Sequence, residues 1–275
     1  METELNNKTL RKVQLVQLEI AKEIDRVCTE NDIKCFLIGG SLLGAIRHKG
    51  FIPWDDDLDL GMLRKDYEKF VKIASTSLNK KYKFIDWKSD SNYPHPMGKV
   101  IKKGTIYKES KRNDLGEQGI WVDIFPYDNI CMKPRRTFFK LKVIRSLIRA
   151  KCNYQTWHSN HGIILMKYIK NLPFRIIAPF FNKNFLIDTY EKISMGKKSG
   201  NVYENGTENY ENWCFKKDFF TRLKKVQFED YYFWAPEQYD EYLKIAYGNY
   251  MELPPIKERE NKHLIVAIDF GEDEN

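Results

Sequence analysis

The sequence lacks the segments that would carry it out of the cell or across a membrane. Residues 1–7 have neither the basic start nor the apolar stretch of a signal peptide. No run approaches the roughly 18 consecutive apolar residues of a spanning helix. We therefore expect a cytoplasmic protein, with attachment to a membrane surface left open.

Paired cysteines are also lacking. The five cysteines are scattered and form no C-x-x-C pair: Cys28, Cys35, Cys131, Cys152 and Cys214. This pattern argues against a zinc site or a disulfide framework and suits a reducing compartment. We expect free, largely buried thiols.

Acidic residues are missing from one long segment. Between positions 129 and 187 there are twelve Lys or Arg and no Asp or Glu, in a chain whose net charge is +8. A solvated basic face would explain this, and so would contact with a membrane surface, a phosphate-rich polymer or a nucleic acid.

The rest of the composition is that of a folded protein. With 275 residues, 42% hydrophobic and 14% aromatic, the chain can bury a core without disulfides. Hydrophobic periodicity predicts helices at 8–30, from a Ser41 N-cap to about Arg47, and at 66–74. It predicts strands at 34–38, 57–62, 83–87, 98–102 and 120–125. Alternating helices and strands indicate an α/β or α+β fold.

We expect three segments. Residues 1–130 form the catalytic core, 131–187 a basic helical insertion, and 188–275 a C-terminal part that completes the same unit. In this last part, 235–255 is predicted to be mainly helical.

The acidic cluster Trp54-Asp55-Asp56-Asp57-Leu58-Asp59-Leu60 carries the strongest chemical signal. Residues two apart on a strand share a side, so Asp57 and Asp59 project together while Asp56 points outward. Two carboxylates suit Mg²⁺, which proteins commonly hold together with substrate phosphates. Such a site serves phosphoryl transfer by neutralising charge and positioning the reacting oxygens.

Gly39-Gly40-Ser41 at a helix start would attract phosphate oxygens, although it has neither Walker nor dinucleotide-binding spacing. Followed by the paired aspartates, it is similar to the nucleotidyltransferase architecture of DNA polymerase β-like enzymes. That architecture expects a third carboxylate on a neighbouring strand. Asp123, the one acid in the apolar run 119–126, is the candidate, with a turn cap before Pro126 as the alternative.

Of three other interpretations of the acidic cluster, two are disfavoured and one stays open. A solvated acidic loop would not alternate with leucine. A calcium loop of the EF-hand type fails, because Leu60 and Asp66 occupy the positions that require glycine and glutamate. A D-x-D glycosyltransferase stays open.

A longer pattern resembles the signature of the LicD family. It runs from Ile38 to Asp59 as IGGSLLGAIRHKGFIPWDDDLD. The resemblance continues in Gly98-Lys99-Val100 with Thr105, in 122–128, in Phe228-Glu229 with Ala235-Pro236, and in YGNYMELPP at 247–255. It is weakest in the basic middle of the chain.

The resemblance implies a nucleotidyltransferase-like fold and transfer of phosphocholine from CDP-choline to a sugar hydroxyl, with release of CMP. The acceptor would be a lipid-linked precursor of a cell-surface glycan, such as lipopolysaccharide or teichoic acid. The family also resembles fukutin-type enzymes, which use other CDP-linked alditols, so the choline is less firmly implied than the CDP.

Carried over residue by residue, Asp57, Asp59 and Asp123 would be catalytic. Together with Asp55 they would bind Mg²⁺, or Mn²⁺. The substrate-binding residues would be Gly39, Gly40, Ser41, Arg47, His48 and Lys99. Trp54, Trp87, Trp121 and Trp157 could supply an aromatic face to a quaternary ammonium, although core packing is the favoured explanation for each one taken individually.

The basic residues between 135 and 175 would hold the enzyme at the anionic inner face of the membrane, while nucleic acid is disfavoured as a partner. Two alternatives remain. One is a nucleotidyltransferase that uses CTP and releases pyrophosphate, and the other is a non-enzymatic protein that binds a phosphate-rich polymer.

Overall fold

The structure is a computed structural model. It describes residues 6–109, 119–130, 135–152, 171–195, 202–205, 214–261 and 265–271. The helices are α1 (Asn7–Glu30), α2 (Gly39–His48), α3 (Arg64–Ser77), α4 (Arg135–Lys151), α6 (Lys183–Met195) and α7 (Tyr239–Tyr247), and residues 171–177 are also helical. Short 3-10 helices span Ala178–Phe180, Lys217–Phe220 and Ile256–Glu258. The strands are β1 (Cys35–Leu37), β2 (Asp59–Leu63), β3 (Tyr82–Ile85), β4 (Gly98–Lys102), β5 (Ile106–Glu109), β6 (Trp121–Ile130), β7 (Val202–Asn205), β8 (Cys214–Lys216), β9 (Leu223–Phe228), β10 (Tyr231–Pro236) and β11 (Ile265–Asp269).

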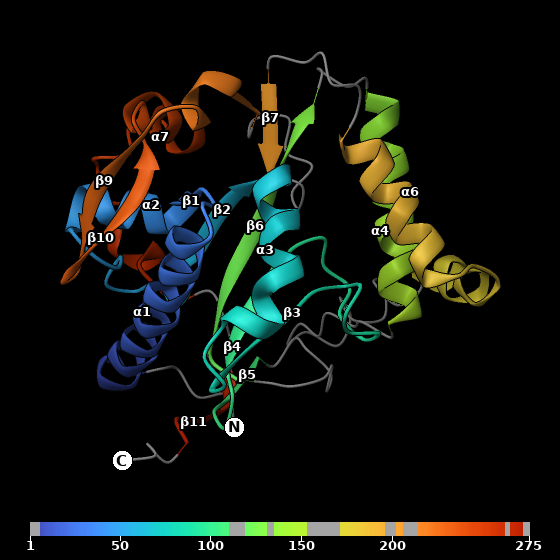
Figure 1. The fold of residues 1–275 in the computed structure, drawn as a ribbon, viewed down its shortest axis with the longest axis horizontal. Coiled ribbons are helices and arrows are strands. Elements are labelled where there is room, and N and C mark those ends of the chain that lie inside the picture. Colours follow the sequence, from blue (N-terminus) through green and yellow to red (C-terminus); the bar gives the residue numbers. More distant parts are fainter. Residues whose placement is uncertain are drawn as a thin grey trace.

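A mixed sheet forms the centre of the molecule (Figure 1). Its strand order is β1-β2-β6-β4-β3, and β7 and β8 extend it from the far half of β6. The neighbours β2 and β6 are parallel, whereas the other pairs are antiparallel. The predicted mixed α/β architecture is confirmed.

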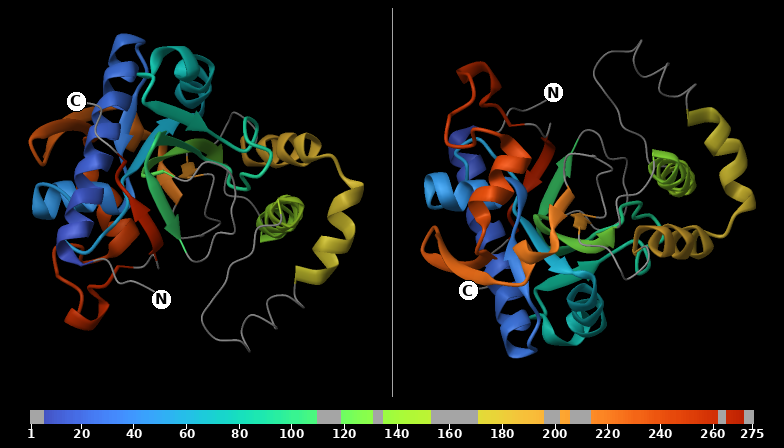
Figure 2. Two further views of the ribbon diagram at one scale, coloured as in Figure 1. Left: turned by 90° about the horizontal axis from the view of Figure 1, so that it is seen from below. Right: turned by 90° about the horizontal axis from the view of Figure 1, so that it is seen from above.

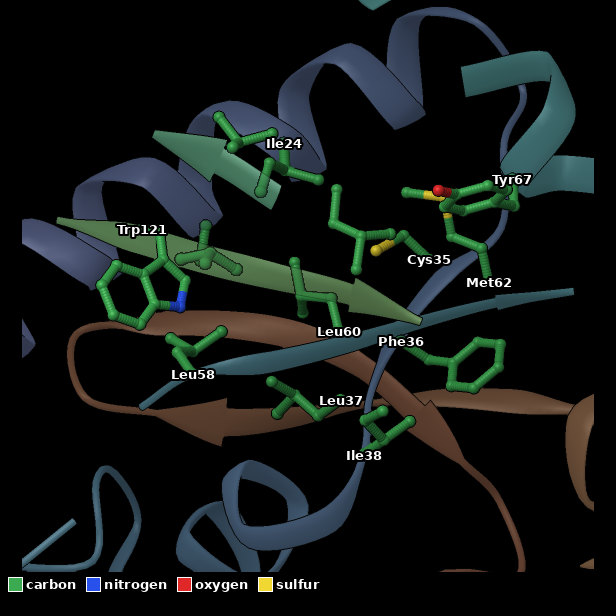
Figure 3. Close-up of a cluster of buried hydrophobic side chains, with 14 of the residues drawn as sticks. Ile24, Cys35, Phe36, Leu37, Ile38, Leu58, Leu60, Met62, Tyr67 and Trp121 are labelled. Carbon is green, nitrogen blue, oxygen red and sulfur yellow. The ribbon is translucent and has the colours of Figure 1, made fainter. Parts of the chain in front are cut away.

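Two helices cover one face of this sheet (Figure 1). Helix α1 starts where the Asn6 side chain accepts a hydrogen bond from the Thr9 amide at 2.9 Å, and it turns Ile20, Ile24 and Val27 inward. Helix α3 contributes Phe70 to the same layer. Figure 3 shows Ile24 of α1 above Cys35 and Leu60 of the first two strands. Helices α1 and α3 therefore cover one face of the sheet, and α2 and the β9–β10 hairpin lie on the opposite face.

The described part of the basic segment is mostly helical, as predicted, with Cys152, Phe181 and Asn182 outside the helices. Helices α4 and α6 lie together at the edge of the molecule (Figures 1 and 2). Glu191 of α6 pairs with Lys88 at 2.6 Å and with Arg64 at 3.7 Å, and the Tyr190 ring contacts Trp87. Residues 153–170 lie outside the described part, and so does Trp157. None of the described helices has the length and apolarity needed to cross a bilayer.

Several local predictions were wrong. Ser41 is not the N-cap of α2: the helix starts two residues earlier, after Ile38. The strand predicted at 57–62 begins only at Asp59. The stretch 235–255 is not mainly helical, because Ala235 and Pro236 end the hairpin strand β10 and only 239–247 forms an α-helix.

The C-terminal part contacts the rest of the fold at several places. Strand β7 pairs with β6, β11 pairs with β5, and β10 packs against β1. The hairpin turn also holds the chain ahead of the acidic cluster. Glu229 accepts a hydrogen bond from the Phe51 amide at 3.2 Å, donates its own amide to Lys49 O at 2.7 Å, and pairs with Arg11. Sequence elements more than 170 residues apart therefore fix the same loop.

Candidate active site

Three charged side chains lie in one row across the middle of the sheet. Asp59 on β2 is in register with Asp123 on β6, and Asp123 is in register with Lys99 on β4. Residues paired in this way on adjacent strands point to the same face. The strand β6 continues through Pro126 to Ile130, so the alternative in which Asp123 caps a turn is wrong.

The backbone at the start of β2 is fixed on both sides of Asp59. The Asp59 amide donates to Ser41 Oγ at 2.8 Å, and its carbonyl accepts from the Ile38 amide at 3.4 Å. The Asp123 amide donates to Leu58 O at 3.1 Å. Ser41 thus positions Asp59 from within the first turn of α2.

Asp59 lies in a strongly acidic surrounding. Burial raises the pKa of the Asp59 carboxyl well above its usual range. The neighbouring carboxylates of Asp57, Asp123 and Asp55 raise this pKa further, in that order, and Lys99 alone opposes them. The four acids that the sequence assigned to metal binding are therefore electrostatic neighbours. Each added negative charge makes a bound cation more favourable.

Asp123 and Lys99 form a buried pair. Lys99 Nζ lies 3.4 Å from Asp123 Oδ1 and 3.7 Å from the centre of the Trp121 ring, and Lys99 is only 2% exposed. The indole Nε1 of Trp121 donates to Asp123 Oδ2 at 3.2 Å. Among the described residues, Asp123 Oδ1 is buried and accepts no hydrogen bond. This oxygen is suited to accept a proton or to contact a cation.

The aspartate loop is held from α1 by two buried glutamines. Gln14 Nε2 donates to Asp55 O at 2.9 Å, and Gln17 Nε2 donates to Asp56 O at 2.7 Å. Asp56 itself points inward, contrary to prediction: it is 2% exposed and accepts a hydrogen bond from Tyr107 Oη at 2.6 Å. Asp56 is therefore an anchor of the loop, while its neighbours Asp55 and Asp57 face the other side.

Helix α2 begins directly beneath the carboxylates. Gly39 has a φ of +51°, and a Cβ there would lie 3.6 Å from Asp59 Oδ2. A Cβ on Gly40 would lie 2.9 Å from Asp55 Oδ2, so any side chain would displace that carboxylate. The positive end of the helix dipole thus faces Asp55 and Asp59. The phosphate-binding role of Gly39, Gly40 and Ser41 stays a prediction.

A cavity of about 940 Å³ opens beside this helix start. Gly40, Arg47, Trp54 and Asp55 line one side, and residues 247–261 supply the other. Arg47 Nη1 donates to Tyr250 O at 2.8 Å, and so it fixes the cavity wall. Its Nε donates to His48 Nε2 at 2.9 Å. Burial, followed by the charge of Arg47, lowers the pKa of His48 and keeps the ring neutral at pH 7.

The described tryptophans differ in what they contact. Trp54 lines the cavity, Trp121 is covered by the Lys99 ammonium, and Trp87 packs on Tyr190. Trp54 is therefore the candidate aromatic face for a ligand. Arg259 lies 5.6 Å from the centre of its ring.

Tyrosines of α7 join the site without having been predicted. The Gly39 amide donates to Tyr242 Oη at 3.2 Å. Burial, followed by Tyr242 and Asp59, raises the pKa of Tyr247 well above its usual range. Both tyrosines belong to a stretch in which aromatic spacing alone is typical of helix packing, so no local signal separates them from core residues.

The described residues contain no ready-made metal site. Among them, no group of three or more His, Cys, Asp or Glu side chains is arranged so that it could hold a metal ion. Magnesium is usually held by one or two carboxylates, with waters and substrate phosphates completing the coordination. The carboxylates that raise the pKa of Asp59 are compatible with a partial site of this kind, and the metal stays a prediction.

Comparison with known proteins gives a consistent picture. Residues 32–146 match the family described as LicD/FKTN/FKRP, nucleotidyltransferase domain. The chain is 29% identical to the lipopolysaccharide cholinephosphotransferase LicD of Haemophilus influenzae over 262 residues, which cover 93% of this chain and 96% of that protein. It is also 46% identical over 48 residues to ribitol 5-phosphate transferase FKRP of human and mouse, covering 18% of this chain and 10% of each relative.

The site electrostatics predict a pH-dependent response of stability to Mg²⁺. Because the Asp59 pKa is raised on folding, the folded protein binds more protons than the unfolded chain above the ordinary pKa of aspartate. Stability without metal therefore falls as the pH rises through this interval. Thermal unfolding should show a larger Mg²⁺-induced rise in midpoint at about pH 8 than at about pH 5. Asp59→Asn should raise the metal-free midpoint and remove most of the response, and an unchanged response in this variant would contradict the assignment.

The loop anchors predict a second effect. Gln17→Leu keeps the side-chain size but removes the donor to Asp56 O, so Asp55 and Asp57 lose their fixed position. We expect Mg²⁺ affinity, measured by calorimetry, to fall about 10–100-fold. Gln227→Leu, the same change on the exposed hairpin, is the control. Equal affinities in the two variants would show that α1 does not position the site.

Proposed function

We propose, from the match of residues 32–146 to the family described as LicD/FKTN/FKRP, nucleotidyltransferase domain, that the protein is a metal-dependent phosphotransferase. It moves phosphocholine from CDP-choline to a sugar hydroxyl of a cell-surface glycan precursor and releases CMP. The observation that supports this most is the row of Asp59, Asp123 and Lys99, together with the neighbouring Asp55, which lines a cavity large enough for a nucleotide-linked donor.

The core of the proposal is a nucleotidyltransferase-like site. Asp55, Asp57, Asp59 and Asp123 would hold Mg²⁺, or Mn²⁺, which would neutralise the donor diphosphate. Lys99 adds a fixed positive charge that the described contacts keep beside Asp123. Gly39 and Gly40 let the carboxylates of Asp59 and Asp55 approach the start of α2, and Ser41 holds the Asp59 backbone. Arg47 and His48 fix the adjoining cavity wall.

Asp123 is the proposed general base. The acceptor hydroxyl oxygen attacks the phosphorus that carries the choline, and the bond from this phosphorus to the bridging oxygen breaks, with CMP as the leaving group. The hydroxyl proton passes to Asp123 Oδ1, which accepts no hydrogen bond from the described residues and is ion-paired with Lys99 Nζ at 3.4 Å. Trp121 holds the other oxygen of this carboxylate and so fixes its direction.

The cavity favours a cationic alcohol on the donor. Among the described residues, its lining includes Asp55 and three glutamates, Glu252, Glu258 and Glu260, against the cation Arg47 in the lining and Arg259 over the Trp54 ring. Trp54 adds an aromatic face, and a quaternary ammonium is attracted by aromatic rings and by negative charge. Similarity to a cholinephosphotransferase along nearly the whole chain points the same way, whereas similarity to the ribitol 5-phosphate transferase is confined to 48 residues.

The proposed acceptor is a lipid-linked precursor of lipopolysaccharide or teichoic acid. Such an acceptor would place the enzyme in the cytoplasm, peripherally at the inner face of the membrane. The basic residues between 135 and 175 would support this location, since each Lys or Arg near an anionic surface contributes about 1 kcal/mol.

A second candidate is a nucleotidyltransferase that uses CTP and releases pyrophosphate, which the description of the matched domain favours. The two functions differ in product. A non-enzymatic polymer-binding protein and a D-x-D glycosyltransferase have no comparable support, because the family match is to a nucleotidyltransferase domain and the long-range similarity is to a cholinephosphotransferase.

Incubation with a panel of donors tests the proposal. With CDP-choline, CDP-ribitol and CTP offered in turn alongside a glycan acceptor and Mg²⁺, CMP should appear fastest from CDP-choline. Asp59→Asn and Asp123→Asn should each lower the rate at least about 10²-fold. Asp230→Asn, an exposed carboxylate paired with Lys22, should not. Pyrophosphate release from CTP, or full turnover of Asp59→Asn in EDTA, would overturn the proposal.

A further inference from the structure

The outward face of one helical run is unusually apolar. Residues 171–177 are helical and lead directly into the 3-10 turn Ala178–Phe180. Leu172, Ile176 and Phe180 recur at intervals of four and therefore stack on one side. Ile176 is 62% exposed and Phe180 is 84% exposed. This side of the run faces solvent.

The opposite side of the same run already packs on the protein. Ala178 is buried, and Phe174 contacts the hydrophobic core. The helical run therefore already buries its inner face, and the exposed apolar side chains belong to its outer face. Three further exposed residues lie beside them, and we call the whole set the apolar ridge: Leu172, Ile176, Ile177, Phe180, Phe181 and Phe185. Contiguous exposed apolar surface of this kind marks an interaction site.

The ridge lies at the periphery of the molecule. In Figures 1 and 2 the yellow run at 171–177 forms the outer edge on the side away from the β9–β10 hairpin. Helix α4 packs against both the 3-10 turn and α6. A flat partner could reach this edge without meeting the rest of the fold.

The charge around the ridge is mainly positive, and the first acid after the basic segment is the exposed Asp188 of α6. Arg136, Lys140 and Lys142 are exposed on α4, and Lys151 Nζ donates to Ala178 O at 3.4 Å behind the ridge. No acidic residue occurs between 129 and 187. Helices that lie in a membrane interface combine Phe and Leu on one side with Lys and Arg around them. A protein partner would typically meet a surface of mixed charge.

We propose that the apolar ridge inserts into an anionic lipid bilayer, with the basic residues of α4 contacting the headgroups. This goes beyond electrostatic attraction of residues 135–175, because the ridge extends to Phe185 and acts by burying apolar area. The membrane proposal rests on the proposed function in one respect: membrane binding would bring the active site to a lipid-linked acceptor.

Cosedimentation of the full chain with vesicles tests the proposal. Wild type should bind vesicles of phosphatidylglycerol and phosphatidylcholine, and should bind pure phosphatidylcholine more weakly. Ile176→Ser/Phe180→Ser should weaken binding to the anionic vesicles at least about tenfold, because two large apolar side chains no longer enter the bilayer. Leu15→Ser/Tyr232→Ser makes the same kind of change at exposed positions of α1 and β10 and should bind as wild type does.

Three results would overturn the proposal. These are no binding by wild type, equal binding by the ridge variant, and a wild-type dimer that the ridge variant splits, which would assign the ridge to a second copy of the chain. An unchanged thermal midpoint shows that the ridge variant is folded. CMP release with a soluble glycan acceptor separates the two proposals, since the ridge variant should retain turnover there even where vesicle binding is lost.

Discussion

The structure depends on the cost of placing several carboxylates side by side at the centre of a sheet. Asp59 and Asp123 are neighbours in register, and Asp57 and Asp55 add charge from the preceding loop. Like charges in a partly buried setting repel strongly, and here the pKa of Asp59 is well above its usual range. Lys99 offsets part of this repulsion from the adjacent strand. The repulsion that Lys99 does not offset is the physical reason for expecting a cation at this site, and with it a phosphate-bearing substrate.

The surrounding fold keeps these acids in place. Gln14 and Gln17 hold the loop from α1, and Tyr107 holds Asp56 from β5. Strand β5 is paired with β11 near the end of the chain, and Glu229 in the β9–β10 turn fixes the residues just before the loop. Gln14, Gln17 and Glu229, which help to position the site, thus come from both ends of the chain and lie outside the segment 32–146 that matches the family.

The sequence was a good guide where the pattern was local. The period of 3.6 in α1 and the apolar run of β4 predicted these elements closely, and the apolar run at 120–125 predicted the first half of β6. The lone acid in that run, Asp123, is in register with Asp59, and its role stays a prediction. Prediction failed where a residue's role depends on a distant partner. Asp56 was expected to point outward because strand alternation was extended into the loop, whereas its partner Tyr107 is 51 residues away. Ser41 resembled a helix cap, but its hydroxyl accepts from the Asp59 amide instead. Tyr242 and Tyr247 have no local signal that distinguishes them from core residues.

In the proposed mechanism, the four aspartates would place a metal ion on the phosphates of a CDP-linked donor. Phosphorus NMR of CDP-choline with Mn²⁺ in place of Mg²⁺ tests it most directly, because a paramagnetic ion broadens the signals of nuclei that it coordinates. We predict strong broadening of both phosphorus signals by wild type, beyond that caused by Mn²⁺ alone, and none by Asp59→Asn under the same conditions. Equal broadening by the two proteins, or no broadening beyond free Mn²⁺, would contradict the account.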